Sequence, residues 1–148
     1  MHIERATCAD DKLVAALARL IPQLNPKSAL PTRDDLAAMI ASPGTHLLIA
    51  RDPGCEPDLG SDIIGTLTLT LFRIPVGMQG RINTVVVDAC ARGRGIGEAL
   101  TREAIVISRT AGVRRITLSS RNERAAAHRM YRRVGFETTP NEQFHLLL

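Results

Sequence analysis

Cysteine, aromatic residues and long apolar runs are all scarce in this chain of 148 residues, and each scarcity excludes a class of protein. The apolar runs are too short to span a membrane. The N-terminus is charged at once and lacks the apolar stretch of a secretory signal. We therefore expect a cytoplasmic protein with no membrane contact. Its 45% hydrophobic and 23% charged residues are typical of a globular protein, which predicts a single domain over residues 1–148.

The three cysteines, Cys8, Cys55 and Cys90, form neither a disulfide framework nor a metal-ligand pattern. They are odd in number and far apart, and they lack a CxxC pair or a histidine at metal-binding spacing. We expect buried or half-buried free thiols in a reducing cytoplasm rather than a disulfide, and no bound metal.

Positive charge is concentrated in one segment. Residues 1–91 hold 8 basic and 10 acidic residues, whereas residues 92–133 hold 3 acidic residues and 11 basic ones, all arginine. Arginine matches phosphate and carboxylate oxygens, so we expect a polyanionic ligand here; a solvated basic helix face is the alternative. Tyr131 is the only aromatic residue of this segment, which leaves no stacking platform for bases and argues against a nucleic-acid partner.

Hydrophobic periodicity predicts a mixed α/β sheet with helices on its faces. Strands are expected at 3–6, 45–52, 63–73, 81–89 and 114–120, with closing strands from 136 onward and at 143–148, and helices at 10–21, 32–42, 96–111 and 123–134. Segment 53–62 reads as a hairpin loop. The continuous apolar run at 81–89 predicts burial on both faces, and the alternation of strands and helices over 81–134 predicts a parallel strand pair.

The stretch RGRGIGEAL, residues 92–100, places a glycine-rich turn between a strand and a helix. Backbone N–H groups in such a turn and at a helix N-terminus bind anions. The Walker A motif is excluded because no Gly-Lys pair occurs, and the dinucleotide motif GxGxxG fails because its third position is Glu98. A short anion-binding loop remains, with a plain strand-to-helix connector as the alternative.

Three motifs together resemble the GNAT superfamily, the acetyl-CoA-dependent N-acetyltransferases. RGRGIG (92–97) matches the signature [RQ]-x-x-G-x-[GA], VVVD (85–88) resembles the fourth strand of that family, and AHRMYRRVGFE (127–137) resembles its A-x-x-x-Y-x-x-x-G-F-E segment. The resemblance implies an α/β fold with a mixed, mostly antiparallel sheet, a parallel central strand pair and helices on both faces.

The resemblance also implies acetyl-CoA as cosubstrate and a set of residues that contact it. Backbone N–H groups across 93–98 would hold the pyrophosphate, and the pantetheine arm would lie along the strand before them. The implied contact residues are Val85, Val86, Val87, Arg92, Gly93, Arg94, Gly95, Ile96, Gly97, Glu98 and Asn122. Four arginines, namely Arg92, Arg94, Arg124 and Arg129, are candidates to meet the 3′-phosphate or a substrate carboxylate.

The implied reaction is acetyl transfer to a primary amine of a small molecule or peptide, by direct attack in a ternary complex. Tyr131 stands where the family keeps its general acid; simple packing with Ala127 and Val134 on one helix face is the alternative reading. The implied partners also include a second copy of the chain, since homodimers are common in the family.

No carboxylate lies on 81–84 or 117–120, so the general base is left open. Asn83 or Ser119 could orient a water, His46 or His128 could accept the proton by their pKa range, or the amine could arrive neutral. The candidate acceptor loops are 22–31 and 72–80. The missing base also keeps open a second hypothesis, a catalytically idle acyl-CoA-binding or sensor module.

Overall fold

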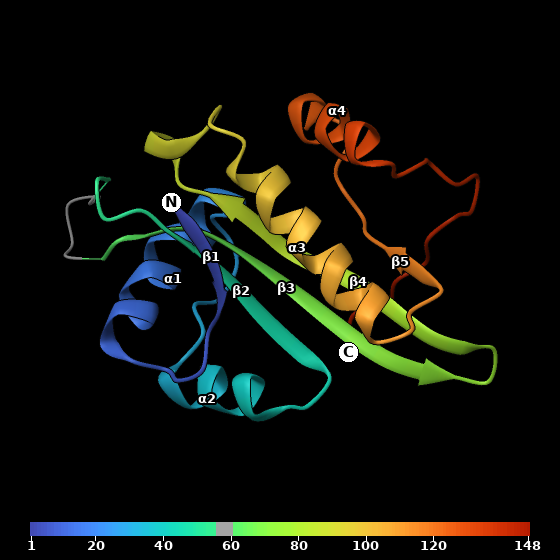
Figure 1. The fold of residues 1–148 in the computed structure, drawn as a ribbon, viewed down its shortest axis with the longest axis horizontal. Helices are drawn as coiled ribbons and strands as arrows, with labels where there is room; N and C mark the ends of the chain where they lie inside the picture. Colours follow the sequence, from blue (N-terminus) through green and yellow to red (C-terminus); the bar gives the residue numbers. More distant parts are fainter. Residues whose placement is uncertain (56–60) are drawn as a thin grey trace.

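Five strands form one sheet whose spatial order follows the sequence, β1-β2-β3-β4-β5. The computed structural model describes residues 1–55 and 61–148, in which the strands are β1 (His2–Arg5), β2 (Thr45–Arg51), β3 (Ile63–Ile74), β4 (Gly77–Val87) and β5 (Arg115–Thr117). Neighbours run antiparallel except β4 and β5, which are parallel (Figure 1). The predicted mixed sheet with a parallel pair is confirmed.

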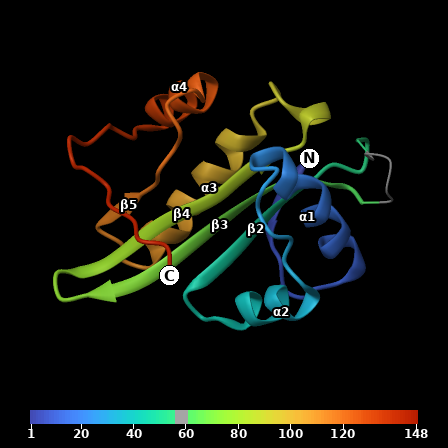
Figure 2. The same ribbon diagram turned by 180° about the vertical axis from the view of Figure 1, so that it is seen from behind.

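Helices cover both faces of the sheet. Helices α1 (Asp11–Leu24) and α2 (Arg33–Ala41) lie on the face turned toward the viewer in Figure 2, whereas α3 (Ile96–Thr110) lies on the face seen in Figure 1. The short 3-10 turn η1 (Ala89–Ala91) leads from β4 toward α3, and α4 (Ala125–Val134) lies beside α3. None of the helices in the described part of the chain is long and apolar enough to cross a membrane.

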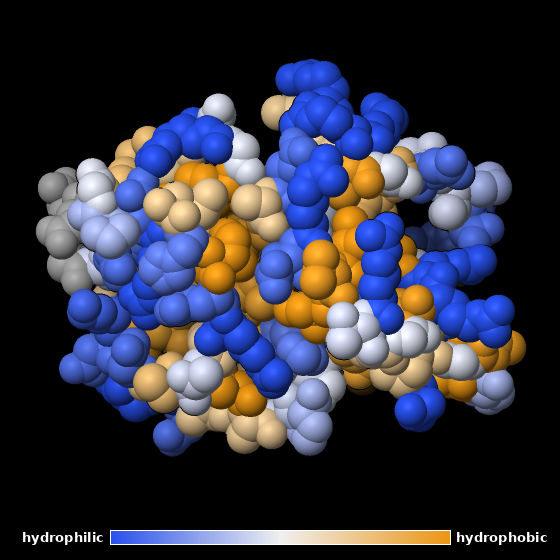
Figure 3. All heavy atoms as spheres, in the orientation of Figure 1, coloured by the Kyte–Doolittle hydropathy of each residue, from blue (hydrophilic) through white to orange (hydrophobic). Residues whose placement is uncertain are grey.

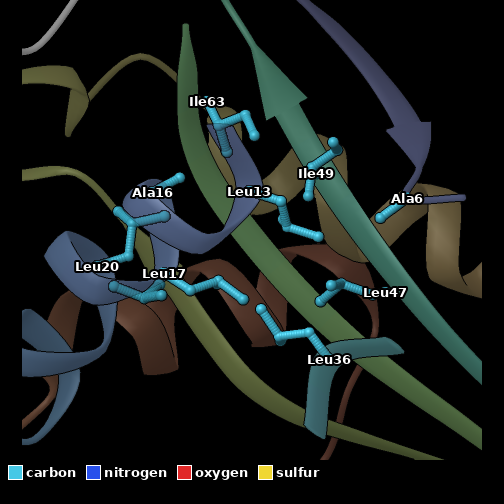
Figure 4. Close-up of a cluster of buried hydrophobic side chains, with 10 residues drawn as sticks. Ala6, Leu13, Ala16, Leu17, Leu20, Leu36, Leu47, Ile49 and Ile63 are labelled. Carbon is cyan, nitrogen blue, oxygen red and sulfur yellow. The ribbon is translucent and has the colours of Figure 1, made fainter. Parts of the chain in front are cut away.

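The alternation of side chains along each strand divides the apolar core into two layers. Leu47 and Ile49 of β2 pack toward α1 and α2, together with Leu13, Leu17, Leu20 and Leu36 (Figure 4). The intervening Leu48 and Ala50 face α3 instead, together with Leu67, Leu69, Ile96 and Leu100. The sheet therefore holds α3 firmly, and with it the glycine turn that begins this helix.

Local signals account for most helix ends. Oδ1 of Asp10 accepts a hydrogen bond from the backbone N–H of Leu13 at 2.8 Å, which caps α1. Thr32 and Asp35 form a reciprocal capping box at the start of α2. Gly112 follows α3 with φ +75° and Gly135 follows α4 with φ +114°, a region that glycine adopts at little cost.

Helix α1 is longer than predicted, because it continues through Pro22 to Leu24. Proline removes one N–H donor, which favoured an end at residue 21. Ile21 and Leu24 nevertheless pack against the core layer of α1 and α2, and this burial outweighs the local signal.

The prediction that the run 81–89 is buried on both faces was wrong. Strand β4 begins at Gly77 and ends at Val87; Asn83 is exposed, and Thr84, Val85 and Val87 are only half-buried. The reason is that β5 pairs with β4 only at residues 79–81, so the rest of β4 has an open side.

The predicted closing strands are also absent: the structure places no strand in residues 135–148. Strand β5 is a short partner, with three residues rather than the seven predicted at 114–120. The tail is held to this region by a side-chain hydrogen bond from Ser119 Oγ to Gln143 Oε1 at 3.1 Å, while Phe144 and the three C-terminal leucines are exposed.

The predicted hairpin loop 53–62 lies partly outside the described residues, which exclude 56–60. At its base the N–H of Asp52 donates to the carbonyl of Asp62 at 2.8 Å. Just beyond, Cys55 Sγ lies 3.6 Å from Cys90 Sγ in the connection that follows β4. Two free thiols that are 35 positions apart in the chain thus meet beside the glycine turn. The expected burial of the cysteines was wrong for two of the three, because Cys8 and Cys90 lie in exposed connections and only Cys55 is half-buried.

Candidate functional site

A β-bulge in β4 marks the centre of the candidate site. Thr66 of β3 lies opposite Val86, but Thr68 lies opposite Asn83, so β4 contains one extra residue between these pairs. Within the bulge, Thr84 has φ +51° and is the only non-glycine residue with positive φ in residues 1–55 and 61–148. A β-branched residue adopts this conformation only where the surrounding structure enforces it.

Beyond the bulge, β4 presents a backbone edge without a partner strand. The N–H of Asp88 donates to the carbonyl of Ile64 on β3 at 2.8 Å. Because backbone groups alternate in direction along a strand, the N–H and C=O groups of Val85 and Val87 point to the opposite edge, where the Val87 carbonyl accepts a hydrogen bond from Arg92 Nε at 3.2 Å. That edge faces the side where β5 has already separated from β4.

A cavity of about 630 Å³ fills this separation. Its walls come from β4, the turn 91–98, the segment 118–121 after β5, and α4, with the C-terminal end of α1 at one side. The mouth lies between the turn and α4, where Figure 3 shows a notch in the surface beside the hydrophilic side chains of α4.

The glycine turn lines one end of this cavity with exposed backbone. Gly93 has φ +78° and Gly95 has φ +76°, and no atom lies within 4 Å of the position that a Cβ would occupy on either one. Helix α3 begins immediately after Gly95 without a side-chain cap, so its first N–H groups have no intrahelical or capping partner. This combination of open space and N–H donors suits an anion.

Cations outnumber anions around the same cavity. Five arginines line it, namely Arg81, Arg92, Arg121, Arg124 and Arg133. Glu98 is the one carboxylate among the described lining residues, and hydrogen bonds from Arg133 and Arg102 lower its pKa. The carboxylate is therefore ionised and already paired, which leaves an excess of positive charge.

Tyr131 of α4 also lines the cavity. Its ring meets Phe136 edge-on, with centroids 5.9 Å apart and planes at 69°. Burial raises the pKa of the phenol, and the nearby charge of Arg124 opposes this only in part. The hydroxyl consequently retains its proton at neutral pH and can act as a donor.

The structure brings together most of the residues that the sequence singled out. Val85, Val87, Arg92, Gly93, Gly95, Ile96, Gly97 and Glu98 line the cavity. Three others lie apart from the lining: the Val86 side chain is buried in the α1 layer, Arg94 pairs with Asp52 at 2.5 Å, and Asn122 is exposed. Of the arginines considered for a phosphate, Arg92 and Arg124 line the cavity, whereas Arg94 and Arg129 do not.

Of the four candidate residues for the general base, two line the cavity and two do not. Asn83 and Ser119 line the cavity, and Ser119 Oγ also accepts from Arg81 at 3.3 Å. His46 and His128 are not among its lining residues. Burial, aided by the charge of Arg5, lowers the pKa of His46, which lies on β2.

A second cavity, of about 340 Å³, lies on the α1 and α2 side of the sheet. Thr84 lines both cavities, so the bulge is the point at which they approach each other. The sequence analysis missed Thr84 and this cavity, because no local motif indicates either one.

Two segments were expected to be acceptor loops. Of loop 22–31, residues Ala29, Leu30 and Pro31 line the second cavity. Segment 72–80 is not a loop, because it forms the end of β3, the start of β4 and the turn between them.

The described residues contain no cluster of three or more histidine, cysteine, aspartate or glutamate side chains that could hold a metal ion. At the first cavity the structure places the open glycine turn, the outward edge of β4 and the Tyr131 phenol.

Comparison with known proteins identifies the fold and the family. The model of the acetyltransferase (GNAT) family matches residues 13–136. The chain is 33% identical over 136 residues to a probable glucosamine 6-phosphate N-acetyltransferase 2 of Oryza sativa subsp. japonica, covering 88% of this chain and 77% of that protein. It is 39% identical over 73 residues to mycothiol acetyltransferase of Beutenbergia cavernae, covering 49% of this chain and only 25% of that longer protein. A putative acetyltransferase from Agrobacterium tumefaciens has the same fold, with a TM-score of 0.77 at 24% identity, covering 100% of this chain and 99% of that one.

Proposed function

Because the chain belongs to the GNAT family of acetyltransferases, we propose that it transfers the acetyl group of acetyl-CoA to a primary amine of a small molecule or peptide in a ternary complex. The observation that carries the proposal is the open glycine turn at Gly93 and Gly95, which adjoins the unpaired edge of β4 within one cavity. When bound, acetyl-CoA supplies the acetyl group as an activated thioester.

The residues of the first cavity fit such a ligand. A Cβ at Gly93 or Gly95 would occupy the open space over the turn, where the N–H groups at the start of α3 can hold the pyrophosphate. The outward N–H groups of Val85 and Val87 and the Val85 carbonyl can pair with the amides of the pantetheine arm, as a strand edge pairs with an added strand, whereas the Val87 carbonyl accepts from Arg92 at 3.2 Å. Arg92 and Arg124 are the cations placed to meet a further phosphate.

Tyr131 acts as the general acid in this proposal. Its phenol remains protonated because burial raises its pKa, and it can donate that proton to the leaving thiolate. The edge-on contact with Phe136 holds the ring in one orientation. An N–H group on the edge of β4 polarises the thioester carbonyl.

The amine must lose a proton before it attacks. Glu98 cannot serve, since it is paired with two arginines. Asn83 and Ser119 offer polar atoms inside the cavity that can orient a water, through which the proton leaves to solvent. The acceptor is then used in its neutral form, and the rate rises with pH as the amine deprotonates.

Thiol release from acetyl-CoA, measured across a panel of amines, tests the proposal. We expect turnover with at least one amine class and a large loss of turnover in Tyr131→Phe. If CoA binds but no amine releases thiol, the chain is an acyl-CoA-binding module without catalytic activity, and the proposal fails.

A further inference from the structure

We propose that the second cavity holds the body of the acceptor, and that this body is apolar and carries no phosphate or carboxylate. The inference rests on the proposed function, because it assigns the acceptor side of that same reaction. The substrate class is a primary amine attached to a short aliphatic or aromatic group.

The walls of the cavity are apolar. Leu17, Leu36 and Leu47 contribute buried side chains from α1, α2 and β2, and Ile21 and Met39 contribute half-buried ones. Leu30, in the loop between α1 and α2, is 50% exposed and stands at the mouth. An apolar group entering here would cover surface that water now contacts, which favours binding.

The polar groups of this cavity are few and unsuited to an anion. The Thr66 hydroxyl already donates to the carbonyl of Leu48 at 3.0 Å. Asp35 is the one charged residue among the described residues of the lining, and its hydrogen bonds with Thr32 lower its pKa, so it is ionised. No lysine, arginine or histidine accompanies it in that lining. A phosphate would meet a negative charge and no positive one, whereas an approaching ammonium group would be attracted.

The position of the cavity connects it with the acetyl donor. Thr84 lines both cavities, and it lies in the bulge that separates the paired part of β4 from its unpaired edge. An acceptor with its body between α1 and α2 can therefore present its amine at Thr84, facing the first cavity. The hydroxyls of Thr68 and Thr84 line this inner part and can accept from the amine.

The volume limits the size of the body. At about 340 Å³, the cavity has roughly twice the volume of a protein cavity of ~150 Å³ that binds benzene. A phenethyl or hexyl group fits this space. The rice relative is named for glucosamine 6-phosphate, an acceptor that carries a phosphate, so we infer that this chain selects a different class.

Two measurements test the inference on the full chain. Binding of phenethylamine, hexylamine, spermidine and glucosamine 6-phosphate to the CoA-saturated protein is followed by calorimetry, and kcat/KM is followed by thiol release from acetyl-CoA. We expect phenethylamine and hexylamine to bind and to exceed glucosamine 6-phosphate in kcat/KM by about 100-fold or more. Leu30→Gln should weaken phenethylamine at least about tenfold through KM, because it replaces apolar surface at the mouth with a polar amide and adds no charge that would attract the ammonium group.

Val106→Gln is the matched control, since Val106 of α3 is 53% exposed and lines neither cavity. It should leave both measurements unchanged. Preference for glucosamine 6-phosphate or spermidine would overturn the inference while leaving the proposed acetyl transfer intact. Failure of both apolar amines to bind, or equal effects of the two glutamines, would also overturn it. Binding of phenethylamine that Leu30→Gln weakens, without thiol release, would support the cavity assignment and refute the transfer reaction.

Discussion

The Nε atom of Arg19 in α1 lies 2.7 Å from Oδ2 of Asp88, the residue that directly follows β4. The Asp88 side chain is buried, with 7% of its surface exposed, and the Arg19 side chain is largely buried, with 14% exposed. Arg19 also donates to the carbonyl of Ile63 at 2.6 Å, and Asp88 accepts from the N–H of Cys90 at 3.2 Å. One ion pair thus ties α1 to β3 and to the start of the connection that leads to the glycine turn.

Removing the carboxylate of this pair should destabilise the protein strongly. Asp88→Asn leaves the Arg19 guanidinium buried without its counter-ion, and we expect a loss of about 3–5 kcal/mol in the free energy of unfolding. Urea denaturation measures it. Asp11→Asn is the matched control, because its pair with Arg33 is exposed and should contribute less than about 1 kcal/mol. Equal losses in the two variants would contradict this account.

The same pair predicts a pH dependence. Burial opposes ionisation of Asp88, but the hydrogen bonds from Arg19 and from the Cys90 backbone outweigh it and lower its pKa below 3.8. A lowered carboxyl pKa stabilises the fold above the unfolded-state value and loses that contribution as the pH falls through the folded-state value. The stability difference between wild type and Asp88→Asn should therefore be constant near neutral pH and shrink below about pH 4. A difference that grows on acidification would refute it.

Two glycines with the same backbone conformation allow an effect on ligand binding to be measured separately from the effect of backbone strain. Gly95 has φ +76° and Gly112 has φ +75°, and neither has an atom within 4 Å of a Cβ position, but only Gly95 lines the first cavity. Gly95→Leu and Gly112→Leu should each cost about 1–2 kcal/mol of stability. Only Gly95→Leu should weaken CoA binding, measured by calorimetry on the folded variants. An unchanged CoA affinity in Gly95→Leu would exclude the glycine turn as the phosphate site.

Loss of the Tyr131 hydroxyl should reduce catalysis and leave ligand binding intact. Tyr131→Phe keeps the ring and its contact with Phe136, so we expect kcat to fall about 100-fold or more while CoA affinity is unchanged. Phe136→Leu disturbs the packing but retains the phenol and should have the smaller effect on kcat. Because burial raises the phenol pKa, wild-type kcat should not decline until the pH exceeds about 10. A similar loss in both variants would indicate that Tyr131 only packs.

Cys90 should react slowly with alkylating agents although it is exposed. Its hydrogen bond with the Asp88 carboxylate and its contact with Cys55 raise its pKa from 9.0 to about 11. At about pH 8, such a thiol carries roughly 100-fold less thiolate than one of pKa 9, and the thiolate is the reactive form. Peptide mass spectrometry after iodoacetamide treatment should show a Cys90 rate that still rises above about pH 10. A plateau near pH 9 would disprove this.

Features with a local signal could be predicted from the sequence. The glycine turn, the start of α3 and the tyrosine of α4 follow from residue types and spacing, and the structure places them around one cavity. The Val86 side chain could have been assigned to the opposite layer, because neighbours along a strand point to opposite faces.

The bulge could not be predicted in this way. Its position depends on which residue of β3 faces which residue of β4, and a one-residue change in register reverses the faces of a strand. Thr84 and the second cavity follow from that register and from the packing of α1 and α2. The absence of the predicted closing strands also depends on tertiary pairing. A closing strand needs a neighbouring strand to pair with, and β5 offers only three residues.

The open edge of β4 also bears on solubility. Unpaired N–H and C=O groups along a strand are a template on which other chains can add as strands, and folded proteins protect such edges. Beyond Arg81, this edge of β4 faces the gap that opens between β4 and the segment after β5. The glycine turn and α4 also line that gap. A narrow linear molecule can enter that space, but a second polypeptide strand with its side chains meets the walls. The geometry that would admit a cosubstrate therefore also protects this edge of β4 from pairing with another chain.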